Sequence, residues 1–214
     1  MDVKKYKHII WDWNGTLFND IELCCDIMNN IRTRRNMPKI TLEKYRDVFT
    51  FPVKKYYENV GLDVSDANWE ILSHEFIDEY EARKYECNLF DNALNVLHNF
   101  SKLGISQSIL SAYSQNTLEE IVAKFKIDIH FEKLVGLDNI YAASKMENGK
   151  KWMSELSHAE HEVLLIGDTV HDYEVAKEIG ADCLLVSSGH QVEKNLLDCP
   201  CTIIQSLSQI DFVA

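Results

Sequence analysis

Proline and glycine are scarce in this chain, which has 3 Pro and 8 Gly among 214 residues. Collagen-like and low-complexity disordered chains are much richer in both, and 46% of the residues here are hydrophobic. The sequence therefore predicts an ordered globular protein. At this length we expect one large domain, or a core domain with a small insert.

Basic residues are also in short supply, with 22 Lys and Arg against 34 Asp and Glu and a formal net charge of -12. A charge of this sign repels polyanions and anionic membrane surfaces, so we expect neither nucleic acid nor a membrane as a partner. An anionic substrate would need local compensation by a metal ion, a lysine or helix N-termini.

Targeting and metal-binding patterns are missing as well. No apolar run approaches the roughly 18 residues of a membrane span, and the first residues do not resemble a signal peptide. The 6 cysteines form no CxxC pair and no zinc-binding pattern, which favours reduced thiols. We therefore expect a cytoplasmic protein and assign the cysteines no chemistry.

Short apolar runs that alternate with helical patterns make up most of the chain. Buried strands are expected at residues 8–11, 108–110, 133–135, 163–166 and 183–186. Helices are expected between the later strands, at residues 116–125, 144–156 and 172–179. Because strands that alternate with helices form a parallel sheet covered on both faces, the predicted fold class is α/β with a doubly wound, Rossmann-like sheet.

The interval between the first and second strands breaks this alternation. It is rich in helical patterning and poor in strand runs, and Pro38, Pro52 and Gly61 punctuate it. Helices are expected at residues 20–35, 41–49, 53–59 and 65–85. We interpret it as a small all-α cap, residues 18–87, inserted into an α/β core that consists of residues 1–17 and 88–214.

Polar residues follow the predicted strands, where open α/β sheets bind their ligands. The first strand is followed by residues 12–16, the second by Ser111, and the fourth by Gly167 and Asp168, with Asp172 four residues farther on. Lys145 comes after the third strand and a loop. The sequence thus predicts a pocket in which acidic side chains, a hydroxyl and a lysine converge.

Three lysines lie near that last position: Lys145, Lys150 and Lys151. The capping-box pattern from Ser144 to Glu147 places Lys145 at the first helical position, and the other two lie about 7 to 9 Å farther along the axis. A cation in the first turn opposes the helix dipole and gains nothing there unless an anion lies close by. Lys145 is therefore the preferred anion-binding lysine.

Four segments, taken in order, resemble the four motifs of the haloacid dehalogenase (HAD) superfamily. They are HIIWDWNGTL, SILS, the lysine of YAASK, and VLLIGDTVHD, and the resemblance spans nearly the whole chain. It is greatest for the phosphoglycolate phosphatase-like branch, in which a helical C1-type cap follows the first motif. The resemblance implies a Mg²⁺-dependent phosphatase that acts on a small phosphorylated metabolite.

The resemblance also assigns roles to the acidic residues. Asp12 would be the nucleophile, because a carboxylate at a strand end can attack phosphorus to give an aspartyl-phosphate. Asp12, Asp168 and the backbone carbonyl of Asn14 would hold Mg²⁺, which prefers oxygen ligands. Asp172 is counted with the metal residues, but it could either support the metal site or cap a helix together with Thr169.

Phosphate binding would fall to Thr16, Ser111, Ala112 and Lys145. The Ser111 hydroxyl, at the end of a predicted strand, can donate to a phosphoryl oxygen, and backbone N–H groups around Ala112 point the same way. Lys145 would clamp the phosphate and the nucleophile. His190 follows the fifth predicted strand on the same side of the sheet and is a candidate substrate contact.

Position 14 departs from the family pattern. HAD phosphatases usually carry an aspartate two residues after the nucleophile, which protonates the leaving alcohol and activates water, whereas this chain has Asn14. An amide cannot exchange a proton, and general acid–base catalysis is typically worth about 10²–10⁴-fold in rate. Three explanations stay open: a leaving group that needs little protonation, such as an acyl or aryl phosphate; a donor elsewhere, with Asp20, Glu22 and Tyr57 as candidates; or a weakened site.

Two alternative functions also stay open. HAD members that cleave phosphonates or carbon–halogen bonds lack the second aspartate too, although no cap lysine here is marked as a Schiff-base former. A HAD-fold binding or regulatory protein that catalyses poorly is the other alternative.

Aromatic residues are concentrated in one stretch of the predicted cap: Tyr45, Phe49, Phe51, Tyr56 and Tyr57. They could line a substrate pocket, but aromatic residues at helical spacings more often form core, and we favour the core interpretation.

Overall fold

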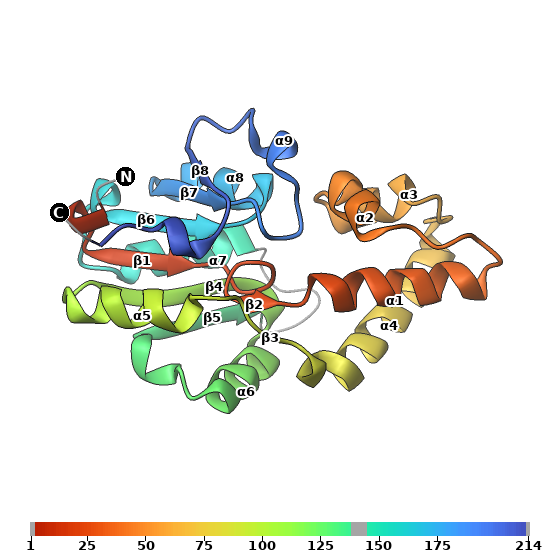
Figure 1. Cartoon of the computed structure of the whole chain (residues 1–214), viewed down its shortest axis with the longest axis horizontal. Coiled ribbons are helices and arrows are strands. Elements are labelled where there is room, and N and C mark those ends of the chain that lie inside the picture. The colour runs from red at the N-terminus through yellow and green to blue at the C-terminus, as the bar shows by residue number, and fades with distance from the viewer. Residues whose placement is uncertain (1–2, 138–144, 213–214) are drawn as a thin grey trace.

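The computed structural model describes residues 3–137 and 145–212, and its largest feature is a six-stranded parallel sheet (Figure 1). The strand order is β5-β4-β1-β6-β7-β8. The strands are β1 (His8–Trp11), β4 (Ser106–Ser114), β5 (Lys133–Leu137), β6 (Val163–Gly167), β7 (Asp182–Val186) and β8 (Thr202–Ile204). The first five include the predicted strands, and the α/β fold class is confirmed.

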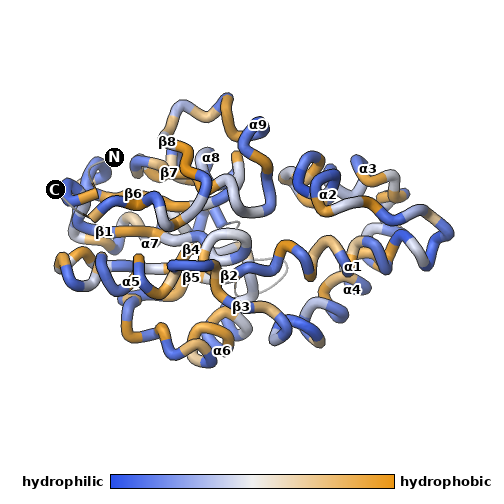
Figure 2. The backbone as a smooth tube through the Cα atoms, in the orientation of Figure 1, coloured by the Kyte–Doolittle hydropathy of each residue, from blue (hydrophilic) through white to orange (hydrophobic). Residues whose placement is uncertain are grey.

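Successive residues of each strand face opposite sides of the sheet and build two apolar layers. The helices beside the sheet are α5 (Ala93–Lys102), α6 (Gln115–Phe125), α7 (Lys145–Glu155), α8 (Val170–Ile179) and α9 (Glu193–Leu196). Ile9 and Trp11 of β1 share one apolar cluster with α5 and α6, whereas Ile10 shares the other with α7, α8 and α9. The apolar strands β1 and β6 appear orange in Figure 2. Both faces are therefore covered, as a doubly wound sheet requires.

Three elements of this part were not predicted: α5, α9 and β8. Helix α5 buries Ala93, Val96, Leu97 and Phe100, so its apolar periodicity was available in the sequence. Strand β8 spans 3 residues and α9 spans 4, which is too short for any periodic pattern.

The remaining helices form the group at the right of Figure 1. They are α1 (Ile21–Arg34), α2 (Leu42–Val48), α3 (Val53–Asn59) and α4 (Asp66–Arg83), which correspond to the four predicted cap helices. In the sequence they lie between β2 (Phe18–Asn19) and β3 (Asn88–Leu89), which pair as an antiparallel ribbon. The ribbon brings together the segments that enter and leave the helical group. The exact limits of the cap, 18 and 87, stay a prediction.

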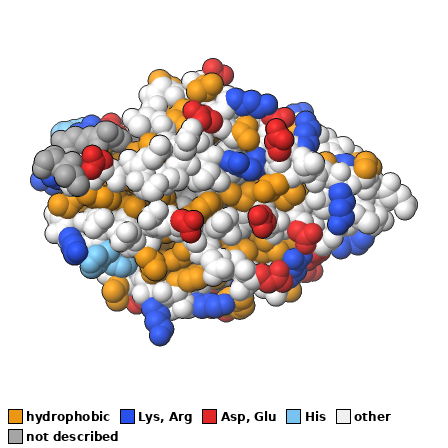
Figure 3. Space-filling model, viewed as in Figure 1, with side chains coloured by type: hydrophobic (Ala, Val, Ile, Leu, Met, Phe, Trp, Pro, Cys, Tyr) orange, Lys and Arg blue, Asp and Glu red, His pale blue; other side chains and the backbone are white. Residues whose placement is uncertain are grey.

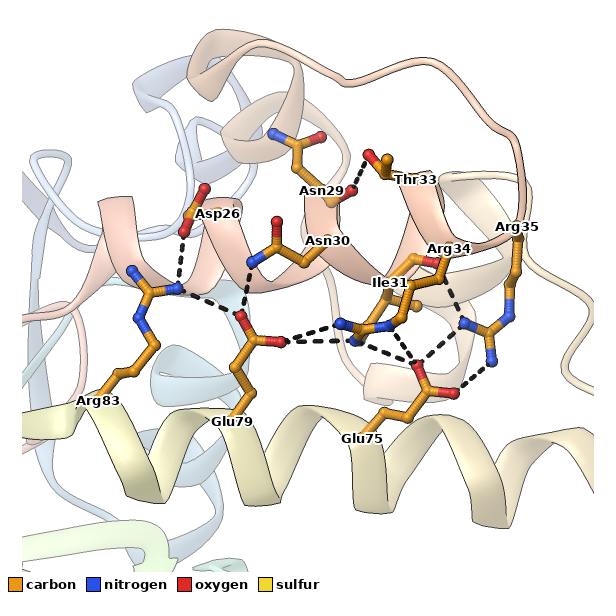
Figure 4. Close-up of polar contacts among 10 residues, drawn as sticks. All are labelled: Asp26, Asn29, Asn30, Ile31, Thr33, Arg34, Arg35, Glu75, Glu79 and Arg83. Atoms are coloured by element: carbon orange, nitrogen blue, oxygen red, sulfur yellow. Dashed lines mark hydrogen bonds and ion pairs between the residues drawn. The ribbon is translucent and has the colours of Figure 1, made fainter.

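Charged side chains connect α1 to α4 (Figure 4). Glu79 accepts a hydrogen bond from Asn30 at 2.6 Å and forms ion pairs with Arg34 at 3.3 Å and Arg83 at 3.2 Å. Glu75 pairs with Arg34 at 3.2 Å. Because these side chains are partly exposed, we expect their ion pairs to add little to the free energy of unfolding. Their main effect would be to align the two helices.

Acidic and basic side chains are interspersed on the face of the molecule shown in Figure 3. Among the described residues, no helix has an apolar stretch of the length needed to cross a bilayer.

His8, the first residue of β1, is fully buried. Its ring nitrogens lie 2.6 Å from Ser106 Oγ and 2.7 Å from Ser108 Oγ. Burial, with a smaller contribution from His158, lowers the pKa of His8 from 6.5 to about 3. Between these values the unfolded chain binds a proton that the folded chain does not, so the free energy of unfolding falls as the pH drops below about 6.5.

We expect His8→Gln to flatten this acid dependence. In the wild type His8 alone removes up to about 1.4 kcal/mol of unfolding free energy per pH unit between about pH 6 and pH 4, and the variant lacks this contribution. Urea unfolding at a series of pH values measures the slope, with exposed His74→Gln as the control. Equal slopes for His8→Gln and the wild type would contradict the assignment.

Candidate active site

A cavity of about 270 Å³ lies between the carboxyl edge of the sheet and the cap helices. The residues predicted for the site that line it are Asp12, Asn14, Ser111, Ala112, Lys145, Asp168 and Asp172. Thr16 is the exception, but its hydroxyl reaches two of these residues, as described below. The predicted residues are thus brought together at one place.

Strand register explains this convergence. Trp11 of β1 is paired with Ile109 of β4 on one side and with Ile166 of β6 on the other. Asp12 follows Trp11 directly, and Asp168 comes two residues after Ile166, so both acids leave neighbouring parallel strands at the same edge.

The prediction that Ser111 ends a strand was wrong. Strand β4 continues to Ser114, and its register against β5 shifts between Leu110 and Ser114. An irregularity of this kind redirects side chains without ending the strand. Ser111 is buried beside the cavity, and its Oγ accepts a hydrogen bond from the Tyr113 N–H at 3.0 Å.

Asp12, Asp168 and Asp172 form an acid cluster. Each offers a carboxylate oxygen within 4.8 Å of the others, and all three are buried. Thr16 Oγ1 donates to Asp12 at 3.3 Å and to Asp168 at 3.2 Å. Burial raises the pKa of Asp168 well above its ordinary value, and the charges of Asp12 and Asp172 add to this despite the opposing charge of His190.

Lys145 is the cation of the acid cluster and the first described residue of α7. Its Nζ donates to Asp12 Oδ1 and, at 2.5 Å, to Asp172 Oδ1. Burial alone would lower the pKa of Lys145, but the two carboxylates outweigh it and raise the pKa. Lys150 instead pairs with Glu178 at 2.7 Å on the exposed side of α7. Ser144, the expected capping residue, lies outside the described residues.

Asp172 caps a helix and also holds Lys145. Its Oδ2 accepts from the Thr169 hydroxyl at 2.6 Å and from the N–H groups of Asp168 and Thr169 at 3.2 and 3.0 Å. Helix α8 therefore begins at Val170, two residues earlier than predicted, because Thr169 is its N-cap. Burial alone would raise the pKa of Asp172, but Lys145 and these hydrogen bonds lower it.

The acid cluster fits a divalent cation. Three buried carboxylates face one lysine, which leaves excess negative charge that Mg²⁺ would neutralise. Both oxygens of Asp172 are already engaged, by Lys145 and by the start of α8. The oxygens of Asp12 and Asp168 also accept hydrogen bonds, from Lys145, Thr16 and the His190 N–H. The assignment of Asp12, Asp168 and the Asn14 carbonyl as the metal ligands therefore stays a prediction.

The Asn14 side chain is turned toward the cap. Its Nδ2 donates to Asp20 Oδ2 and to Tyr80 Oη, both at 2.8 Å. Tyr80 in turn donates to Asp20 Oδ2 at 2.7 Å, and the Gly15 N–H donates to Asp20 Oδ1 at 3.1 Å. His190 Nε2 lies 3.3 Å from Asp20 Oδ1. We call Asn14, Asp20, Tyr80 and His190 the Asp20 network.

His190 connects the Asp20 network to the acid cluster. Its backbone N–H donates to Asp168 Oδ2 at 2.5 Å, and its Nδ1 lies 2.9 Å from the Tyr45 hydroxyl. Burial alone would lower the pKa of His190, but Asp20, Asp168 and Asp12 raise it to about 9. These carboxylates therefore favour the protonated ring, which lies within ion-pair distance of Asp20.

The segment after β7 also fixes α2 over the acid cluster. Arg46 of α2 donates to the carbonyl oxygens of Gly189 at 2.7 Å and Ser187 at 2.5 Å. Gln191 Nε2 donates to the carbonyl oxygen of Phe49 at 2.8 Å. The cap and the core thus meet through specific polar contacts at the site.

The candidate proton donors are found in different places. Asp20 is the centre of the network, and Tyr57 lines the cavity, whereas Glu22 is exposed on α1 and is not among the lining residues. Sequence reasoning missed Tyr80, which lies 66 residues from Asn14, and Arg46. No local pattern signals either contact.

The five aromatic residues of the cap belong both to its core and to the wall of the cavity, the two roles considered from the sequence. Tyr45, Tyr56 and Tyr57 are 1%, 2% and 3% exposed, as core residues are. Yet all three line the cavity, together with Phe49 and Phe51. The aromatic core of the cap is at the same time the wall of the cavity.

The model of the haloacid dehalogenase-like hydrolase family matches residues 9–186. This match covers most of the sequence, so the chain belongs to this family of hydrolases. The matched range begins at the second residue of the first motif and includes the strand that precedes Asp168.

Individual relatives are more distant. Tyrosine-protein kinase PtkA of Mycobacterium tuberculosis is 25% identical over 114 residues, which is 52% of this chain and 39% of that protein. The match therefore spans well under half of the length of PtkA.

Several solved structures share the fold over nearly their whole length. A haloacid dehalogenase-like family hydrolase from Streptococcus pneumoniae has a TM-score of 0.79 at 20% identity, covering 94% of this chain and 93% of that one. A predicted phosphatase from Clostridium acetobutylicum has a TM-score of 0.80 at 18% identity, covering 95% of both. PtkA from M. tuberculosis has a TM-score of 0.79 at 18% identity, covering 95% of both. At such identities the likeness concerns the fold alone.

We expect Gly189→Ala to weaken Mg²⁺ binding. A Cβ at Gly189 would collide with the Asp168 carboxylate, and displacing a ligand in this way costs about 10- to 100-fold in metal affinity. Calorimetric titration with Mg²⁺ measures the change. Gly104→Ala, far from the acid cluster, is the control for general destabilisation, since a Cβ there meets nothing within 4 Å but the positive φ of 71° disfavours a side chain. An unchanged affinity in folded Gly189→Ala would show that Asp168 does not bind the metal.

Proposed function

We propose that this HAD-family hydrolase is a Mg²⁺-dependent phosphatase that removes phosphate from a small phosphorylated metabolite through an aspartyl-phosphate on Asp12. One observation carries the proposal: the Lys145 ammonium donates to the Asp12 carboxylate in a buried cluster that also contains Asp168. A carboxylate positioned by a cation at the end of a parallel strand is suited to nucleophilic attack on an anionic phosphoryl group.

In the first step an Asp12 oxygen attacks phosphorus and the bond to the ester oxygen breaks. The electron pair of that bond leaves with the ester oxygen. Lys145 holds Asp12 in place and balances phosphoryl charge. Ser111 Oγ already accepts from the Tyr113 N–H, so its own proton can be donated to a phosphoryl oxygen.

Asp12, Asp168 and the Asn14 carbonyl would hold Mg²⁺, which when bound offsets negative charge on the phosphoryl oxygens. The Thr16 hydroxyl bridges the carboxylates of Asp12 and Asp168 and so fixes their relative positions. In the second step water attacks phosphorus, the bond between phosphorus and Asp12 breaks, and phosphate leaves with the carboxylate restored.

A second candidate is a HAD-fold protein that catalyses poorly, and Asn14 is the observation that favours it. Asn14 gives its amide hydrogens to Asp20 and Tyr80 and cannot exchange a proton. The relative PtkA is named a tyrosine-protein kinase. Phosphoryl transfer to an acceptor other than water is therefore compatible with this second candidate. Phosphonate cleavage has less support, because the described cap residues around the cavity include no lysine.

Asp12→Asn tests the proposed function directly. We expect Mg²⁺-dependent phosphate release from 4-nitrophenyl phosphate to fall by about 10³-fold or more, because the nucleophile is lost. Chelation of Mg²⁺ should abolish wild-type release. Glu22→Gln, which changes an exposed carboxylate outside the cavity, should retain full activity. Unchanged turnover by folded Asp12→Asn would rule out the mechanism.

We also expect the aspartyl-phosphate to accumulate. Asn14 cannot accept a proton from water, so hydrolysis of the intermediate should be slow relative to its formation from an ester with a good leaving group. Rapid mixing with 4-nitrophenyl phosphate should release a burst of nitrophenol close to one equivalent of enzyme, with the phosphate trapped on Asp12 by acid quenching and mass spectrometry. Linear release from the first turnover would contradict this step.

A further inference from the structure

The part of the cavity beneath the cap helices, where the alcohol portion of a phosphate ester would lie, is lined mainly by aromatic rings. Phe49 stacks on His190 with ring centres 4.9 Å apart, and Phe51 stacks on His171 at 4.8 Å. Tyr45 meets Tyr56 edge-on at 5.5 Å. These contacts hold the rings in fixed positions, and walls of this kind favour a flat, apolar group.

Positive charge on the cavity wall is already paired. Among the described residues that line the cavity, Lys145 is the one lysine or arginine, and it forms ion pairs with Asp12 and Asp172. Residues 138–144 contribute no lysine or arginine to the sequence. His190 pairs with Asp20, and His171 lies 3.3 Å from an oxygen of Glu174.

Carboxylates are, by contrast, present on the cap side of the cavity, where Asp20 and Glu81 both belong to the lining. A second anionic group on the substrate, such as the carboxylate of phosphoglycolate, would lie among these acids without a cation to pair with. Burying such a charge unpaired is unfavourable. The cavity therefore favours a leaving group that carries no charge of its own.

Several hydrogen-bond donors beside the phosphate site already have acceptors within the cavity wall. Both hydrogens of the Asn14 amide, the Tyr80 hydroxyl and His190 Nε2 converge on the Asp20 network. The Tyr113 hydroxyl donates to Glu81 at 2.6 Å. These groups are thus engaged with one another. Tyr56 and Tyr57 also line the cavity, and the Tyr56 hydroxyl is buried without a hydrogen-bond partner among the described residues. Burial raises the pKa of both hydroxyls, which makes them poor proton donors to a departing oxygen.

An ester oxygen that departs without a proton must be a weak base. The hydroxyl of a phenol has a pKa of about 10, whereas that of water, close to an aliphatic alcohol, is about 15.7. A phenolate can leave with the electron pair of the broken phosphorus–oxygen bond and take up a proton from water afterwards, which an alkoxide does far less readily.

We propose that the substrate is a phosphate monoester of an aromatic hydroxyl with no second anionic group. This inference rests on the proposed phosphatase function and adds the class of alcohol. Two independent features support it. The cap side of the cavity is aromatic and poor in cations, which favours an uncharged aromatic group. Asn14 cannot donate a proton, which favours an aryl leaving group.

Four esters separate these features in the presence of Mg²⁺. Phenyl and benzyl phosphate have the same ring but differ in leaving oxygen; 4-carboxyphenyl phosphate adds an anion to the ring; phosphoglycolate is aliphatic and anionic. We expect kcat/KM for phenyl phosphate to exceed that for benzyl phosphate by at least about 100-fold, and that for 4-carboxyphenyl phosphate by at least about tenfold. The ratio kcat/KM is used because it reports the step in which the alcohol leaves.

Asn14→Asp distinguishes the enzyme's preference from the intrinsic reactivity of aryl esters. A carboxyl group at position 14 can supply the missing proton, so the ratio of kcat/KM for phenyl phosphate to that for benzyl phosphate should fall by about 100-fold. The double variant Asn14→Asp, Asp20→Asn exchanges the two groups without adding a charge and serves if the single variant does not fold.

Each outcome decides the matter. In the wild type, comparable kcat/KM values for phenyl and benzyl phosphate or for phenyl and 4-carboxyphenyl phosphate, or a preference for phosphoglycolate, would overturn the assigned substrate class. Asp12-dependent turnover in the same assays would still support the phosphatase. A phenyl-to-benzyl ratio that Asn14→Asp leaves unchanged would also overturn it. Failure of all four esters to give Asp12-dependent phosphate release would overturn both proposals.

Discussion

The candidate active site depends on the buried ammonium of Lys145, which is held between Asp12 and Asp172. Three carboxylates buried together repel one another, and each buried ion that lacks a partner costs several kcal/mol. The lysine reduces this cost only because α7 begins at the edge of the sheet. Asp172 can hold the lysine because it is itself fixed at the start of α8 by Thr169. The position of the Asp12 carboxylate is therefore set by residues at the starts of two helices.

The cap is coupled to this cluster through Asp20, which illustrates how local rules yield to tertiary contacts. Asp20 occupies the N-cap position of α1, yet its side chain makes no capping hydrogen bond. An N-cap bond of this type is worth about 1 kcal/mol. Here the carboxylate instead accepts from Asn14, Tyr80 and the Gly15 N–H. The start of the first cap helix thereby joins the first loop of the core.

The fold was predictable because its signals are local. Buried strands such as β6 have continuous apolar sequences. The parallel register then places the residues that follow the strands at one edge of the sheet. For this reason the sequence could bring Asp12, Lys145 and Asp168 together. Contacts such as Tyr80 to Asn14 depend on how α4 lies over the core, and no spacing encodes them. Ser111 was placed correctly beside the cavity but wrongly at a strand end, because a register shift leaves no apolar signature. The roles of these residues stay predictions.

Asn14 and Asp20 are best understood as a pair. An aspartate at position 14 would place a second carboxylate at about the 2.8 Å now spanned by the amide and Asp20, and two carboxylates at that distance do not both ionise. The amide instead donates to Asp20 and helps to keep it charged, and the charged Asp20 pairs with His190, whose backbone N–H binds Asp168. The substitution that removes the usual proton donor thus stabilises a network that reaches the acid cluster. Restoring an acid at position 14 alone would disturb this network, whereas exchanging the two residues would conserve its charge.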